Sequence, residues 1–224
     1  MAVDRRTSPV STSLAPPLAR AHTLTGGGTE GNARLTAAAG VMLILLLAVL
    51  GVTILRLRPL LSVHLFVGMA LIPPVLLKMG TTGYRFTRYY TSDPAYRRKG
   101  PPEPLMRLLA PFVVLTTVVV FASGVVLLFA GPQSRSTLLP IHKVSFILWL
   151  GVTALHVVGH LPSLPALLRG DYGARPRLGA DVPGRNGRVL SLAAALVAGL
   201  VLAVLVIPEF AAWTHSVALL QGDH

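Results

Sequence analysis

The stretch LLPIHKVSFILWLGVTALHVVGHL, residues 138–161, holds two histidines fourteen residues apart within one apolar run. On an α-helix, fourteen residues rise about 21 Å and complete nearly four turns. His142 and His156 are therefore expected on the same face, one near each surface of a bilayer core about 30 Å thick. Ionisable side chains at such depth are costly, and this cost favours a functional role for both histidines.

Four further apolar stretches have the length of a membrane span, at roughly 35–57, 60–79, 108–130 and 189–207. Each supplies the ~20 residues that a transmembrane helix needs. Pro73-Pro74 predicts a kink in the second span, because proline removes a backbone donor and crowds the preceding turn. The sequence therefore predicts an all-α integral membrane bundle.

The order of these stretches predicts a domain organisation. A four-helix core is expected over 35–165, and a fifth transmembrane helix with an external tail over 189–224. The Ser-, Thr-, Pro- and Gly-rich residues 1–34 predict a disordered tail. A basic loop is expected over 166–188, between the core and the fifth helix.

Composition agrees with a membrane protein, since 53% of the 224 residues are hydrophobic and 12% are charged. Soluble domains carry about 25% charged residues. Because the chain has no cysteine, disulfides, thiolate metal sites, iron–sulfur clusters and covalent c-type haem are excluded. The net charge of +12 would suggest nucleic acid for a soluble protein. Here the basic residues fall mainly between spans, so we expect no nucleic-acid partner.

The basic residues also predict the topology. Sixteen of the 20 lie in the N-terminal tail, the connection between spans two and three, or the connection between spans four and five. The connection between spans two and three is taken to include Lys78 and to run to Arg107. Five spans place all three segments on one side. The positive-inside rule then predicts a multipass plasma-membrane protein with a cytoplasmic N-terminus and an external C-terminus.

Histidines mark two depths in this arrangement. His64 and His142 each lie about four residues into a span that runs from outside to inside. Imidazole is a common axial ligand of haem iron, so this pair is expected to clamp one iron near the outer face. Gly68, one turn below His64, would let a flat ring approach the backbone. A histidine that snorkels or bonds a neighbouring helix, and a glycine that only permits close packing, are the alternatives.

Other residues near the outer pair fit a porphyrin. Ser123 and Gly124 have small side chains and are expected to leave space beside the third span at this depth. Trp149 is expected to be core or lipid-facing filler more than a haem contact. Basic side chains outside the membrane are available to haem propionates: Arg56, Arg58, Arg135 and Lys143.

The inner depth holds His156 and His160, one helical turn apart. Either could face the bundle interior as a cofactor ligand. His160 also suits the end of a helix, where a cation is stabilised by the helix dipole. His156 is the favoured metal ligand of the two.

This layout resembles the small di-haem cytochrome b subunits that anchor formate dehydrogenases and nickel–iron hydrogenases, and related bacterial cytochrome b quinol oxidoreductases. In that family a histidine early in the second helix pairs with the first of two histidines fourteen apart on the fourth. These correspond to His64, His142 and His156, and the resemblance covers about residues 35–165. The family takes its other inner ligand from the first helix, where residues 35–42 hold no histidine. Met42 is a possible substitute.

The resemblance implies haem b, one group held firmly outside and a second one possible inside. It further implies an electron-transfer subunit without substrate chemistry of its own, working in the bilayer with a partner oxidoreductase subunit and quinone. Two alternatives remain from the residues alone: a multipass transporter, and a structural membrane protein with packed histidines. No carboxylate lies within a span, and a proton-coupled transporter usually needs one.

Overall fold

The computed structural model describes residues 26–100, 104–163, 165 and 182–219, and every regular element in these ranges is helical. In chain order the helices are α1 (Gly28–Leu55), α2 (Leu61–Ala70), α3 (Ile72–Tyr90), α4 (Pro94–Arg98), α5 (Pro104–Ala130), η1 (Pro132–Ser134), α6 (Arg135–His160), η2 (Leu161–Ser163), α8 (Arg185–Leu205), η3 (Ile207–Glu209) and α9 (Phe210–Leu219). The all-α prediction is thereby confirmed.

Five stretches are long and apolar enough to cross a bilayer: α1, α2 with α3, α5, η1 with α6, and α8. Their outward faces carry large apolar side chains, for example Leu55 at 83% and Leu205 at 70% exposure. Such exposure suits a lipid environment, because hydrocarbon solvates these side chains and leaves backbone polar groups to the helix itself. The chain is therefore described as a multipass membrane bundle.

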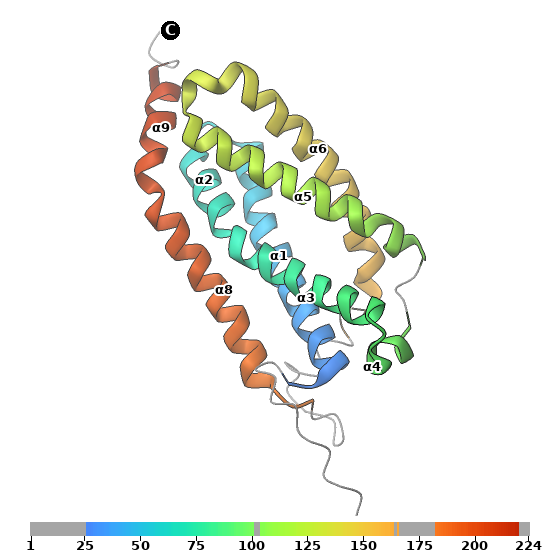
Figure 1. Cartoon of the computed structure of the whole chain (residues 1–224). Helices are drawn as coiled ribbons and strands as arrows, with labels where there is room; N and C mark the ends of the chain where they lie inside the picture. Colours follow the sequence, from blue (N-terminus) through green and yellow to red (C-terminus); the bar gives the residue numbers. More distant parts are fainter. Residues whose placement is uncertain (1–25, 101–103, 164, 166–181, 220–224) are drawn as a thin grey trace, which may run out of the picture.

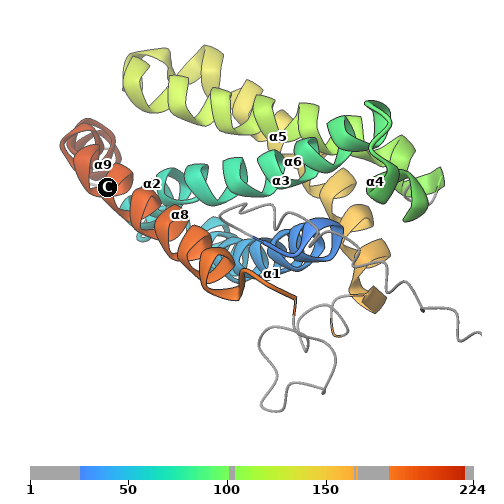
Figure 2. The same ribbon diagram turned by 60° about the horizontal axis from the view of Figure 1, so that its bottom comes forward.

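The second span lies in the middle of the bundle (Figures 1 and 2). Helices α2 and α3 pack against α1 and α8, whereas α5 and α6 form an antiparallel hairpin whose two helices pack mainly against each other. A buried cluster ties these parts together near the α9 end, where Met69 and Ala70 meet Leu127, Leu128 and Trp213.

The predicted interruption of the second span is confirmed. Helix α2 ends at Ala70, Leu71 is a turn, and α3 begins at Ile72 with prolines in its first turn. A proline tolerates this position because its missing N–H has no partner in a first turn anyway.

The predicted end of this span near residue 79 is wrong, because α3 continues to Tyr90. Falling hydropathy marks where the bilayer ends, but arginine and lysine are good helix formers and do not end a helix. Lys78 consequently lies within α3 and not in a connecting loop. The first helix likewise begins at Gly28, within the segment predicted to be disordered, whose residues 1–25 lie outside the described residues. Most of the predicted basic loop, 166–181, also lies outside them.

Helix α8 packs closely against α2 at Gly199. A methyl group added at Gly199 would overlap the backbone carbonyl of Ala70, and Ala203 one turn further is fully buried. Small residues allow such close approach between helices in a membrane, where packing replaces the hydrophobic effect as the driving force.

We predict that Gly199→Ala destabilises the bundle by about 1–3 kcal/mol, since overpacking forces the backbone apart. The measurement is thermal unfolding of the detergent-purified protein. Gly151→Ala is the control, because nothing lies within 4 Å of a Cβ placed there. Equal melting temperatures for the two variants would contradict the α2–α8 packing.

Candidate functional site

His64 is oriented by a hydroxyl of the first helix. Its Nδ1 lies 3.0 Å from the Oγ1 of Thr53, a residue that is 2% exposed. Thr53 Oγ1 in turn donates its proton to the carbonyl of Leu50 in its own helix. The side chain of His64 is thus fixed between α1 and α2, near the outer ends that the sequence predicts.

His142 is oriented in the same manner by the neighbouring helix of its own hairpin. Its Nδ1 lies 3.1 Å from Ser123 Oγ, which donates to the Val120 carbonyl at 3.0 Å. Ser145 Oγ lies 3.2 Å from the same hydroxyl. Gly124 provides the space, since a Cβ there would come within 3.0 Å of the imidazole. Ser123 and Gly124 thus leave room for the His142 ring, the first through a hydroxyl contact and the second through its missing side chain.

The contacts involve Nδ1 of both rings. When the hydroxyl protons of Thr53 and Ser123 bond the carbonyls of Leu50 and Val120, each hydroxyl oxygen accepts from its histidine. Nδ1 then carries the proton in both rings, and Nε2 keeps its lone pair. A metal-bound histidine is commonly held in this way, with the second nitrogen donating to a protein oxygen. Among the described residues, Nε2 of neither ring has a hydrogen-bond partner.

The two oriented imidazoles belong to the same depth of the bundle. They are close enough to interact electrostatically, although α2 and α6 make few direct contacts with each other. Two helices that both ligate one haem must stand apart by the thickness of the macrocycle and two imidazoles. The sparse contact between α2 and α6 is compatible with such a separation.

Gly68 faces open space. It lies one turn below His64, and nothing lies within 4 Å of a Cβ placed on it. Close helix packing, the alternative for this residue, therefore does not account for it. By contrast, the small residues Gly124, Gly159 and Gly199 all lie against a neighbouring helix.

The inner pair differs in accessibility. The rings of His156 and His160 are edge to face with centroids 4.6 Å apart. His160 is exposed, whereas His156 is half-buried. Two enclosed atoms of α6 lack a hydrogen-bond partner among the described residues: Nδ1 of His156 and Oγ1 of Thr153. Unpaired buried polar atoms are rare in proteins, and those at a binding site commonly bond what binds there.

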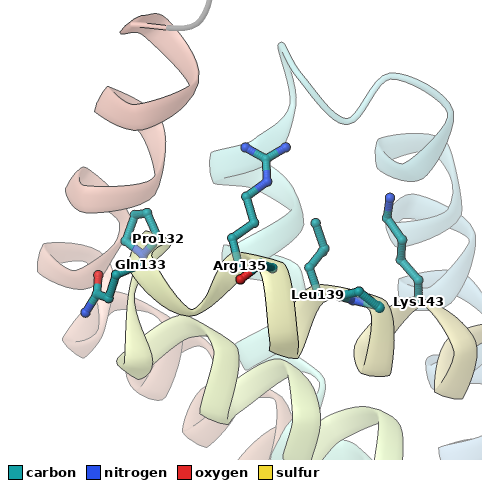
Figure 3. Close-up of a pocket in the computed structure, with 7 residues that line it drawn as sticks. Pro132, Gln133, Arg135, Leu139 and Lys143 are labelled. Atoms are coloured by element: carbon teal, nitrogen blue, oxygen red, sulfur yellow. The ribbon is translucent and has the colours of Figure 1, made fainter.

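A hollow of about 570 Å³ lies at the N-terminal end of α6, lined by Pro132, Gln133, Arg135, Ser136, Leu139, Pro140 and Lys143. Figure 3 shows Arg135 and Lys143 leaving the same side of the helix, two turns apart. Lys143 directly follows His142 in the sequence, and Arg135 lies about two turns before it. Two of the four basic residues expected to serve propionates therefore share one surface.

Trp149 is buried, and its Nε1 donates to Thr117 Oγ1 at 3.0 Å across α5 and α6. The expectation that it is core filler agrees with this contact. Sequence reasoning missed Thr53 altogether, and it placed Lys78 in a loop. Thr53 lies eleven residues before His64 and on a different helix. Helical periodicity relates residues of one helix only, so the sequence could not predict this contact.

Among the described residues, no group of three or more His, Cys, Asp or Glu side chains is placed to hold a metal ion. A haem iron needs only two protein ligands, so a search for groups of three does not test haem binding. The chain matches no family model, no curated protein and no solved structure.

We predict that Trp149→Phe destabilises the α5–α6 hairpin by about 1–3 kcal/mol, because it leaves the buried Thr117 hydroxyl unpaired across the interface. The double variant Trp149→Phe/Thr117→Val should recover much of that loss, since neither partner then remains. Thermal unfolding in detergent measures both. Additive losses in the double variant would show that the indole–hydroxyl bond contributes nothing.

Proposed function

We propose that this chain is a b-type cytochrome of the membrane, an electron-transfer subunit that holds haem between His64 and His142. The observation that carries the proposal is the matched placement of two imidazoles: Nδ1 of each lies within hydrogen-bonding distance of a hydroxyl on a neighbouring helix, which leaves Nε2 as the nitrogen available to a ligand.

Several further features support a haem at this depth. Gly68 lies in open space one turn from His64, where a flat ring would pass close to the backbone. Arg135 and Lys143 line one hollow at the N-terminal end of α6, the helix that carries His142, and would pair with propionates, whose charge lies at the edge of the macrocycle. The histidine pair comes from the second and fourth spans, as in the family that the sequence resembles.

Each group has a distinct task in this proposal. The two imidazoles would hold the iron, and Thr53 and Ser123 would fix the ring planes and raise ligand basicity. The surrounding apolar helices exclude water from the site. Bound haem supplies one-electron chemistry within the bilayer, and a partner redox subunit or a quinone would exchange electrons at the membrane faces.

The proposal predicts that His64→Ala or His142→Ala removes the α-band of the outer haem from a reduced-minus-oxidised spectrum. The haem-to-protein ratio from pyridine hemochrome should fall by one in either variant, because each loses one of two axial bonds. His215→Ala, an exposed histidine of α9, is the control and should keep the wild-type ratio. An unchanged ratio in both core variants would exclude this site, and a wild type without haem would favour a transporter or a structural protein.

The oriented hydroxyls generate a second prediction. Thr53→Val and Ser123→Ala should keep the α-band, weaken haem retention by about 10- to 100-fold, and raise the midpoint potential. The potential rises because an imidazole without its Nδ1–H acceptor is a weaker donor to ferric iron. Redox titration of the purified protein measures the shift. Thr116→Val is the control, since that hydroxyl bonds only carbonyls of its own helix, and equal potentials in all three variants would argue against the tautomer assignment.

A further inference from the structure

Lys78 is a basic residue inside a membrane span. It lies on α3, and its Nζ donates to the carbonyl of Thr36 on α1 at 2.7 Å. Gly40, one turn from Thr36, makes room for it, since a Cβ there would come within 3.0 Å of Nζ. No acidic partner for Lys78 occurs among the described residues. A cation held only by one carbonyl is an expensive way to pack a membrane helix.

The register of the helices gives Lys78 a counterpart. Lys78 follows His64 by fourteen residues along the second span, as His156 follows His142 along the fourth. Both spans run in the same direction. If His64 and His142 lie at one depth, Lys78 and His156, each fourteen residues further along, also lie at one depth. In agreement, Lys78 lies within electrostatic reach of His156.

The chemistry of the side chain suits a ligand. The chain has three lysines against seventeen arginines, yet lysine occupies this inner position. A guanidinium cannot lose its proton in a protein, whereas an amine can and then offers a lone pair. The neutral amine keeps two hydrogens, one of which can remain on the Thr36 carbonyl.

We propose that Lys78 Nζ is the axial ligand opposite His156 for a second haem at the inner depth. This inference rests on the proposed function, and it replaces the histidine that the resemblance would place on the first helix. On binding, the ammonium releases one proton to solvent and the nitrogen lone pair forms the bond to iron. On α6, Nδ1 of His156 is enclosed and has no hydrogen-bond partner among the described residues.

The structure argues against Met42, the substitute expected from the sequence. Gly40 faces Lys78, and Met42 lies two residues later, about 200° around the helix. Its side chain therefore leaves α1 on the side away from the inner pair. His160 is exposed and shares the helix of His156, so it cannot approach from the opposite side of a macrocycle.

Lys78→Arg tests the proposal, because arginine keeps the positive charge and a donor for Thr36 but cannot ligate iron. Wild-type protein should bind two haems by pyridine hemochrome, and Lys78→Arg should bind one while keeping the outer α-band. Lys99→Arg, an exposed lysine of the same cytoplasmic end, is the matched control and should bind two. The retained outer haem reports that the variant is folded.

The other outcomes also decide the matter. Two haems in Lys78→Arg, or one haem in wild type that the substitution leaves intact, would overturn the inference but not the proposed function. A wild type without haem would overturn both. Where Lys78→Arg loses both haems, the ferric wild type decides: EPR and near-infrared magnetic circular dichroism should show one imidazole–amine centre, and two bis-imidazole centres would overturn the assignment.

Discussion

Within a bilayer an imidazole has no water to bond, so leaving its polar nitrogens without a partner costs free energy. Thr53 and Ser123 meet this need for the outer histidines while their own protons satisfy carbonyls of their helices. These contacts orient both rings. The proposed haem site follows from this constraint more than from the histidines themselves.

The middle span, α2 with α3, is packed closely on one side and loosely on the other. On one side α2 and α3 are packed closely by α1 and α8, where Gly199 and Ala203 let backbones approach. On the other side α6 contacts α2 and α3 little. Tight packing on one side holds His64 and Lys78 in place, and the looser side is where the histidines of α6 approach.

Much of the fold followed from sequence patterns, and the errors have physical causes. Apolar length located all five spans, and Pro73-Pro74 located the break between α2 and α3. Span ends were less certain, because lysine and arginine extend a helix beyond the bilayer. Lys78 was placed in a loop because the helix was assumed to end where hydropathy falls. Its position fourteen residues after His64 is nevertheless visible in the sequence.

The sequence by itself determined the number of candidate spans, and it predicted the depth of each histidine and the common face of His142 and His156, because these depend on hydropathy and helical repeat along one chain. Only the tertiary structure decided which hydroxyl meets which imidazole, that Gly68 faces open space, and that Lys78 reaches across to α1. Those features depend on how helices rotate and pack against one another. No periodicity within a single helix records that rotation.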